Sequence, residues 1–312
     1  MKDLDISVVI VNWNTKELLL ECLKSVFETI RDISFEVWLV DNASSDGSVQ
    51  AVRNRYPSVL VIQNDRNLGF AAANNLAFRR MSGRYALLLN TDTVLTEGAI
   101  KKLHGFMESN PQAGLACGQL LNSDGSKQNS IANFPSLLSL LVNESILSVF
   151  FPKRFPSKRG EYTSPLEIDS CIGACMMARK KTMEEVGLFD ERFFFFLEET
   201  DWALRMKRAG WKIYYVPGAH IFHHQGQSVG HGVNSRKIFY TSRYAYYRKW
   251  HPRLYPLFFT IIFLRLLVEA CLSLAGVLAT LGLSRGMRTK FVTYFKLILW
   301  HLCGCPPAWQ PC

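Results

Sequence analysis

The sequence lacks the glycine-rich loops that cradle nucleotide phosphates. It contains neither Gly-x-Gly-x-x-Gly nor Gly-x4-Gly-Lys-Ser/Thr, so dinucleotide-binding and P-loop proteins are poor comparisons. Its eight cysteines include no pair of Cys-x2-Cys knuckles, which argues against a structural zinc site. Internal repeats and low-complexity segments are also absent. Chemistry in this chain therefore has to come from other side chains.

Acidic residues are scarce in the last 65 residues, where eight lysines and arginines stand against one acid, Glu269. The whole chain of 312 residues carries a net charge of +10. A basic and apolar segment favours an anionic membrane surface. No DNA-binding motif or basic–aromatic platform accompanies it, so we expect no nucleic-acid partner. The chain begins directly with a strand pattern, so we expect no signal peptide and a cytoplasmic location.

The apolar part of this segment is long. Leu257–Leu283 holds two charges in 27 residues, and as a helix it would span about 40 Å at ~1.5 Å per residue. That length crosses a hydrocarbon core of about 30 Å, but an in-plane helical hairpin with the amphipathic run 291–302 fits equally well. A soluble oligomer interface is the third alternative. We expect residues 251–312 to form a membrane-association segment behind a catalytic domain at 1–250.

Short apolar runs alternate with helical patterns along the first 120 residues. This alternation predicts an α/β fold with a mostly parallel, doubly wound sheet. The expected strands are 6–12, 35–40, 59–63, 85–89 and 114–120, and the expected helices are 15–30, 69–81 and 96–109. Two more short strands are expected at 212–216 and 220–223. Residues 121–168 are irregular, proline-containing and basic at 153–159, which favours a mobile or acceptor-facing region.

Four successive strands of this pattern end in Asn/Asp clusters: Asn12 and Asn14, Asp41 and Asn42, Asn64 and Asp65, Asn90 and Asp92. Any one cluster is explained by the preference of these residues for turns. Ligands of such sheets bind beyond the carboxyl ends of the strands, so four clusters at one edge predict a polar site. Asp92 offers hard oxygens for Mg²⁺ or Mn²⁺, and His223 or His224 could add an imidazole.

Three carboxylates follow four consecutive phenylalanines at 193–196: Glu198, Glu199 and Asp201. A helical pattern runs on from them to Gly210. Acids at a helix start are stabilised by the helix dipole, by about 0.3–1 kcal/mol each. Beside an aromatic wall they can also be tuned as proton acceptors. The block is therefore either a helix start or the position of a catalytic base.

Taken together, the motifs resemble the family 2 inverting glycosyltransferases of GT-A fold, and within them a bacterial rhamnosyltransferase-like branch. The resemblance covers about residues 5–250. It rests on Val8-Val-Ile-Val-Asn-Trp-Asn14, Val40-Asp-Asn-Ala-Ser-Ser-Asp-Gly-Ser48, Asn67-Leu-Gly-Phe-Ala-Ala-Ala-Asn-Asn75, Leu87-Leu-Leu-Asn-Thr-Asp92, Gly173-Ala-Cys-Met-Met177, Glu198-Glu-Thr-Asp-Trp202 and His223-His-Gln-Gly-Gln-Ser228.

The resemblance implies roles for these positions. Asp92 and His223 would hold Mg²⁺ or Mn²⁺, with Asn90 in place of the first acid of the family's Asp-x-Asp. Glu199 would be the base that deprotonates the acceptor, with Asp201 as runner-up and Glu198 as an acceptor-binding or orienting residue. The nucleotide-sugar would contact Val11, Asn12, Asn14, Asp41, Asn42, Asn67, Gly69, Phe70, Asn74, Asn90 and Thr91.

The implied function is transfer of L-rhamnose from a dTDP donor to a saccharide on a polyprenyl diphosphate, at the cytoplasmic face of the inner membrane. A homo-oligomer is compatible with it. A UDP- or GDP-sugar donor and a non-catalytic nucleotide-sugar-binding assembly protein are the alternatives. A nucleotidyltransferase would need a Gly-rich basic loop, which residues 12–17 do not supply.

Overall fold

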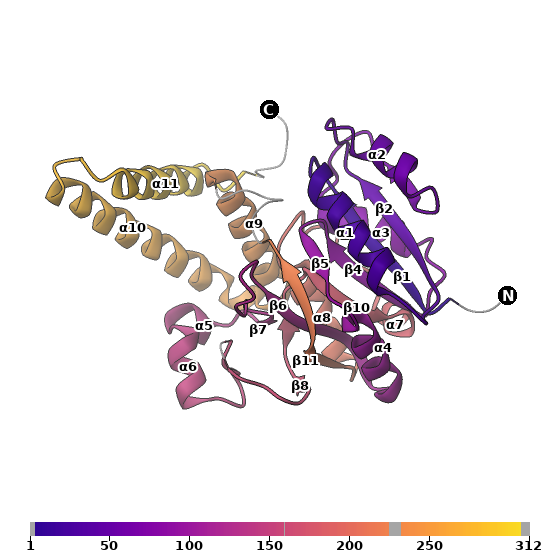
Figure 1. The fold of residues 1–312 in the computed structure, drawn as a ribbon. Helices are drawn as coiled ribbons and strands as arrows, with labels where there is room; N and C mark the ends of the chain where they lie inside the picture. Colours follow the sequence, from indigo (N-terminus) through magenta and orange to yellow (C-terminus); the bar gives the residue numbers. More distant parts are fainter. Residues whose placement is uncertain (1–3, 159, 225–231, 307–312) are drawn as a thin grey trace. The chain divides into compact units, whose positions relative to one another are not determined.

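The computed structural model describes residues 4–158, 160–224 and 232–306. They divide into two compact units (Figure 1). The first comprises Met1–Phe194 and Glu198–Ser228, and the second comprises Phe195–Leu197 and Val229–Cys312.

The first unit is built on one mixed, mostly parallel sheet with the order β3-β2-β1-β4-β10-β6-β11-β5, and β8 pairs with β11 at its side. Its strands are β1 (Ile6–Asn12), β2 (Phe35–Asp41), β3 (Leu60–Gln63), β4 (Tyr85–Asn90), β5 (Thr93–Leu95), β6 (Ala113–Leu121), β8 (Leu166–Glu167), β10 (Cys175–Arg179) and β11 (Lys212–His223). β1 to β4 pair in parallel. The predicted α/β class is confirmed.

Two details of the sheet differ from the sequence prediction. β10 lies antiparallel between β4 and β6, so the sheet is not purely parallel there. The two strands expected at 212–216 and 220–223 are one strand, β11, whose pairing with β6 shifts between Val216 and His220. Pro217 and Gly218 therefore make an irregularity within the strand, as β-bulges do.

Helices flank this sheet, and the apolar faces of strands and helices form one core (Figure 1). The helices are α1 (Lys16–Thr29), α2 (Ser48–Arg55), α3 (Phe70–Phe78), α4 (Ala99–Ser109), α7 (Lys180–Val186) and α8 (Glu198–Arg208). α1 begins one residue later than expected, and Thr15 at its N-cap position caps no backbone N–H with its side chain. Its hydroxyl is held instead by Asn12 and Thr91.

The irregular region contains an excursion of two short helices. It leaves β7 (Ile131–Ala132) and returns at β9 (Ser170–Cys171), and these two strands pair antiparallel. Between them lie α5 (Leu137–Leu141) and α6 (Glu144–Phe150). Ser136 caps α5 in a capping box, and Asn143 caps α6. Local capping chemistry thus makes two helices where the pattern predicts irregular chain.

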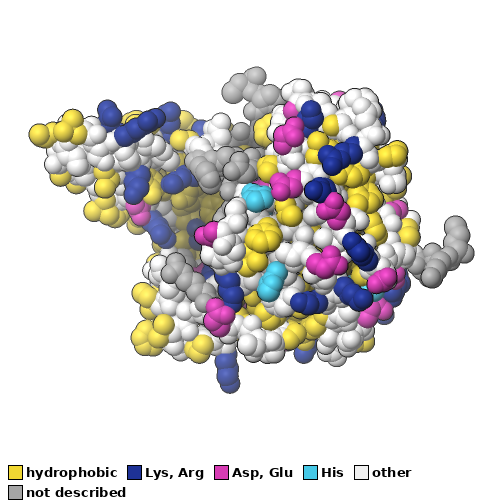
Figure 2. Space-filling view, viewed as in Figure 1, with side chains coloured by type: hydrophobic (Ala, Val, Ile, Leu, Met, Phe, Trp, Pro, Cys, Tyr) yellow, Lys and Arg dark blue, Asp and Glu magenta, His cyan; other side chains and the backbone are white. Residues whose placement is uncertain are grey.

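The second unit consists of α9 (Val233–Trp250), the 3₁₀ turn η1 (Pro252–Leu254), α10 (Tyr255–Ala279) and α11 (Arg285–Leu302). It groups α9 with the C-terminal helices, although residues up to 250 were expected in the catalytic domain. Among the described residues one helix, Pro252–Ala279, is long and apolar enough to cross a membrane. Only 22% of its most apolar window is buried, unlike a soluble core helix. Figure 2 shows dark blue cationic side chains along this unit.

Candidate active site

The expected polar edge of the sheet forms where the parallel strands end. Asn12, Asp41 and Asn90 are the last residues of β1, β2 and β4. Asn12 stands opposite Asp41, and Val11 stands opposite Asn90. The three strand ends therefore meet at one edge, which is the ligand-binding position of such sheets.

Asn12 and Asp41 are fully buried, and their side chains hydrogen-bond to the loops around them. The Asn12 amide nitrogen lies 2.8 Å from Asp41 Oδ1 and 2.8 Å from Ser48 Oγ. The other carboxylate oxygen of Asp41 accepts from the Ser44 backbone N–H at 2.9 Å. Asn14, at φ +54°, accepts a hydrogen bond from the backbone N–H of Ser45, the residue after Ser44. This network shapes the strand-end loops.

A second set of amides builds the loop before α3. Gly69 has φ +83°, and a Cβ there would lie 2.5 Å from the Phe194 backbone oxygen, so only glycine fits. The next N–H, that of Phe70, donates to the same oxygen at 2.7 Å. Asn67 accepts from the Gly69 N–H, and Asn74 donates to the Phe70 carbonyl. Asn42 donates to the Gly69 carbonyl, joining this loop to the end of β2.

Asp92 and His223 are brought together by strand pairing. β5 pairs antiparallel with the end of β11, with His223 opposite Thr93. Asp92 Oδ1 lies 3.5 Å from His223 Nε2, and both side chains are buried. That oxygen has no hydrogen-bond partner among the described residues. A buried carboxylate oxygen without a partner is costly, so its presence here calls for a cation or a proton.

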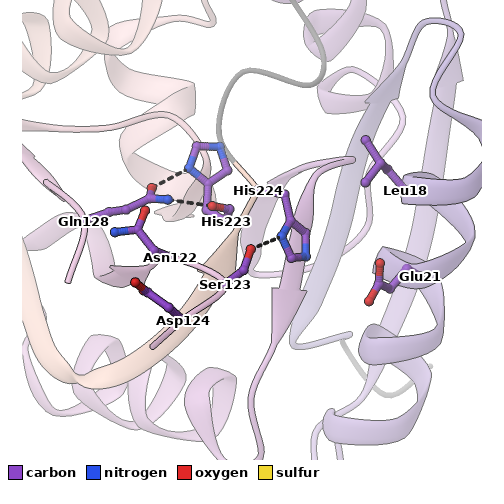
Figure 3. A pocket seen from close by; sticks show the side chains of 8 residues that line it. All are labelled: Leu18, Glu21, Asn122, Ser123, Asp124, Gln128, His223 and His224. Atoms are coloured by element: carbon purple, nitrogen blue, oxygen red, sulfur yellow. Dashed lines mark hydrogen bonds between the residues drawn. The ribbon is translucent and has the colours of Figure 1, made fainter. Parts of the chain in front are cut away.

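Gln128 determines which ring nitrogen of His223 carries the proton (Figure 3). The Gln128 amide nitrogen donates to the His223 carbonyl at 2.6 Å, which fixes the amide with its oxygen toward the ring. That oxygen lies 2.9 Å from His223 Nδ1, so Nδ1 is the nitrogen that donates. In a neutral imidazole Nε2 then has a lone pair, and it faces the unpartnered oxygen of Asp92. Asp92 and His223 are thus the two residues that would hold a divalent metal, with the outer hydrogen bond typical of ligating histidines. The described residues contain no group of three or more His, Cys, Asp or Glu side chains around such an ion.

A cavity of about 700 Å³ opens beside this pair (Figure 3). α1 supplies Leu18 and Glu21, and the turn after β6 supplies polar side chains. His224 is held there by Ser123, whose Oγ lies 2.8 Å from its Nδ1. The lining residues are Leu18, Glu21, Asn122, Ser123, Asp124, Gln128, His223 and His224. The remainder of the histidine motif, residues 225–228, lies outside the described residues.

The three carboxylates begin α8, as the sequence indicates, but their surroundings differ. Glu198 is buried, and its Oε2 has no hydrogen-bond partner among the described residues. Burial, and then the nearby Glu199, raise the pKa of Glu198 well above its usual value. Glu199 is only partly buried. The environment thus drives Glu198 toward its neutral form, which leaves room for a negative charge beside it.

Asp201 has a structural partner. Its fully buried carboxylate accepts from Arg205 Nε at 2.9 Å. The same guanidinium donates to three backbone carbonyls, those of Val186, Gly187 and Leu188. The Asp201–Arg205 pair therefore joins α8 to the end of α7.

The carboxylate block and the strand edge lie side by side. The Asn90 N–H donates to the Ala174 carbonyl at 2.9 Å. Gly173, one residue earlier, faces Glu199, because a Cβ built at 173 would lie 3.8 Å from Glu199 Cγ. The Phe194 carbonyl contacts α3 from the other side. The structure thus brings the strand-end residues and the α8 carboxylates into one site.

Sequence reasoning missed Gln128 and Trp13. Gln128 is 95 residues from His223 and lies in the irregular region, so no local pattern indicates it. Trp13 follows β1 and is 49% exposed. The sequence signal for Trp13 was a large aromatic residue inside the polar strand-end motif, between Asn12 and Asn14. The structure adds that this side chain is exposed at the ligand-binding edge.

Comparison with known proteins identifies the family of this chain. Residues 7–187 match the model of the family described as glycosyl transferase family 2. The chain is 32% identical over 209 residues to N-acetylglucosaminyl-diphospho-decaprenol L-rhamnosyltransferase of Mycobacterium tuberculosis, covering 62% of this chain and 68% of the relative. It is 27% identical to rhamnosyltransferase WbbL of Escherichia coli, over 50% of this chain and 61% of the relative.

Solved structures share the fold. The mannosyltransferase PcManGT from Pyrobaculum calidifontis, solved with GDP-Man and Mn²⁺, superposes with a TM-score of 0.55 at 16% identity, over 95% of this chain and 87% of its own. GalNAc-T7, solved with UDP, GalNAc and Mn²⁺, also superposes with a TM-score of 0.55 at 16% identity, over 79% of this chain and 50% of its own. These likenesses show the GT-A architecture. With the family match and the rhamnosyltransferase relatives, they establish that the chain belongs to glycosyl transferase family 2 and is a glycosyltransferase.

Proposed function

We propose that this glycosyltransferase transfers L-rhamnose, with inversion, from dTDP-rhamnose to a saccharide carried on a polyprenyl diphosphate. The sugar and the acceptor class follow the name of the mycobacterial relative, an N-acetylglucosaminyl-diphospho-decaprenol L-rhamnosyltransferase. The dTDP carrier is what the family resemblance implies. WbbL, a second rhamnosyltransferase, supports the same sugar. The polysaccharide would belong to the bacterial cell envelope.

The observation that carries the proposal is the Asp92–His223 pair. Its unpartnered oxygen and the lone pair set by Gln128 fit Mg²⁺ or Mn²⁺. When bound, such an ion neutralises charge that develops on the leaving diphosphate. The carboxylate oxygen of Asp92 suits both ions. Asn90, whose backbone N–H joins the strand end to Ala174, would contact the nucleotide-sugar through its side chain.

The donor side would use the strand-end loops. The buried network of Asn12 and Asp41 holds the loop residues Asn14 and Ser44 in place for the nucleotide. We assign Trp13 the face on which the nucleobase stacks, because aromatic–aromatic stacking contributes about 0.5–1.5 kcal/mol beyond area burial. The loop at Asn67, Gly69 and Phe70 and the residues Asn74 and Thr91 would shape the sugar pocket. The close approach of the Phe194 backbone to Gly69, where a Cβ would lie 2.5 Å from the Phe194 oxygen, supports this role of the loop.

The acceptor side would use Glu199. Its carboxylate takes the proton from the acceptor hydroxyl while that oxygen attacks the anomeric carbon. The bond to the nucleotide diphosphate breaks on the opposite face, which inverts the configuration. Gly173 adds no side chain beside the proposed base, where a Cβ would lie 3.8 Å from Glu199 Cγ. The neutral form favoured at Glu198 keeps a second charge away from the reacting proton. Asp201 is the weaker candidate, because Arg205 already binds it.

The second unit would hold the enzyme at the cytoplasmic face of the inner membrane. α10 fits a spanning or in-plane anchor, and Arg285, Arg288, Lys290 and Lys296 would meet anionic headgroups. We propose the division into a catalytic domain and a C-terminal membrane segment on this basis.

Thermal stabilisation by a panel of nucleotide-sugars, with and without Mn²⁺, tests the donor. We expect dTDP-rhamnose with Mn²⁺ to raise the melting temperature most and to be consumed with a polyprenyl-diphosphate-linked acceptor. A larger effect of a UDP- or GDP-sugar would overturn the donor assignment. Binding of every donor without turnover would favour the non-catalytic alternative.

A further inference from the structure

The helices α5 and α6 carry apolar side chains on two faces. Leu140, Leu147 and Phe155 are buried and form the inward face of the excursion. The outward face is also apolar, with six side chains between 45 and 74% exposed: Leu138, Leu141, Ile146, Val149, Phe150 and Phe151. Helices at the surface of soluble proteins normally place polar residues outward. We call these six residues the α5–α6 patch.

The patch is a concentrated feature of the first unit's surface. Its members fall within residues 138–151, and Figure 2 shows yellow side chains gathered where Figure 1 labels α5 and α6. Single exposed apolar residues are common on proteins and carry no message. Groups of large ones in contact with solvent indicate a binding surface.

Cations border this patch. Lys153, Arg154 and Lys158 follow it directly, and residues 138–158 contain one acid, Glu144. Arg154 pairs with Asp169 and Lys158 pairs with Glu144. Lys153 is exposed and has no ion-pair partner among the described residues. With the other two cations paired, Lys153 leaves one uncompensated positive charge at the border of the apolar face, which is complementary to an anionic bilayer surface.

Charge also argues against other occupants. A two-fold contact between two copies of this patch would set the same cations against each other, because such contacts pair a surface with itself. The chain's own second unit is basic as well, with one acid after residue 247. Neither offers the negative charge that a bilayer of anionic lipid supplies.

We propose that the α5–α6 patch is a second membrane-contact site, which inserts its apolar side chains into the headgroup region of an anionic bilayer. The excursion closes at Asp169, which accepts from the Phe134 N–H. The chain then runs through β9 to Gly173, which faces Glu199. Membrane contact here holds the acceptor side of the first unit at the bilayer, independently of α10. The inference goes beyond the proposed function and stands whichever sugar is transferred.

Hydrogen–deuterium exchange of the full chain, with and without vesicles of phosphatidylcholine and phosphatidylglycerol, tests the site. Bound protein should show slowed exchange over residues 137–151 and over α10. The variant Val149→Glu/Phe150→Glu should lose the slowing at 137–151 and bind these vesicles at least about tenfold more weakly. Both positions are exposed, so the fold should be retained, with an unchanged melting temperature.

Ser58→Glu/Leu60→Glu is the matched control, since it adds two charges at exposed positions of the same unit. It should bind as the unmodified chain does. Lys153→Gln should weaken binding to anionic vesicles by about fivefold and leave binding to pure phosphatidylcholine unchanged. Exchange over 137–151 that stays fast in vesicle-bound protein would overturn the inference. So would a vesicle-free dimer, seen by light scattering, that Val149→Glu/Phe150→Glu abolishes.

Transfer to a soluble acceptor analogue separates this inference from the proposed function. The Val149→Glu/Phe150→Glu variant should transfer to it at the normal rate, because no patch residue belongs to the proposed catalytic site. If the unmodified chain transfers no sugar yet shows the slowed exchange, the proposed function fails and the membrane site stands. If transfer is normal and the exchange is unaffected by vesicles, the reverse holds.

Discussion

Glu199 and Asp201 differ in their surroundings by enough to separate a catalytic role from a structural one. Glu199 is partly exposed beside Gly173, whereas Asp201 is fully buried and bound to Arg205. We expect Glu199→Gln to lose activity and keep stability. We expect Asp201→Asn to lose stability and keep activity at a permissive temperature.

The magnitudes follow from these contacts. Removal of a general base slows a reaction by about 10²–10⁴, or about 2.7–5.4 kcal/mol of barrier at ~1.36 kcal/mol per tenfold. Removal of one partner of a buried ion pair costs about 3–5 kcal/mol. Arg205 is 18% exposed and keeps its three carbonyl partners. Asp201→Asn should therefore cost less, about 2–3 kcal/mol, or about 5–10 °C in melting temperature.

The assay compares kcat for rhamnosyl transfer at 15–20 °C below the melting temperature of each variant, as a temperature offset of roughly 15–20 °C keeps a domain of this size folded. Calorimetric unfolding of both variants supplies the stability. Arg205→Met is the control, because it also removes the three carbonyl hydrogen bonds and should therefore lose more stability than Asp201→Asn, with kcat retained. A stable Asp201→Asn variant whose kcat is about 10²-fold lower, which corresponds to a barrier about 2.7 kcal/mol higher, would refute the reasoning. Near-normal turnover by Glu199→Gln would refute it as well.

Three further outcomes are expected. Gln128→Leu should weaken Mn²⁺ binding about 10–100-fold by calorimetry, because His223 loses its orienting partner, while Asn122→Ala in the same cavity should not; equal affinities would contradict the role of Gln128. Burial raises the pKa of Glu198 in the folded state, so its contribution to stability is full below pH about 4.5 and is lost as pH rises toward the folded pKa. Glu198→Gln should thus raise the free energy of unfolding more at pH 8 than at pH 5, and the opposite trend in urea titrations would count against its burial. Gly69→Ala should cost about 1–3 kcal/mol of stability, because its Cβ meets the Phe194 carbonyl; an unchanged urea midpoint would show that the loop adjusts freely.

The order of strands and helices was predictable because apolar periodicity and strand-end residues are local signals. The ends of β1, β2 and β4 meet as expected, since parallel pairing places Asn12, Asp41 and Asn90 at one edge. The family followed from the order and spacing of its motifs. The antiparallel insertion of β10 could not be read in this way, because strand direction depends on the path of the chain between β6 and β10.

The sequence by itself determined the fold class, the family and the carboxylate block, because each is encoded in neighbouring residues. Tertiary structure alone decided how the block divides its work. The spacing of Asp201 and Arg205 on a helix was visible, but the burial that makes the pair structural was not. The burial of Glu198 and the contact of Gln128 with His223 likewise depend on residues that are distant in sequence. Desolvation and long-range hydrogen bonds depend on the packed chain, and local pattern carries no record of them.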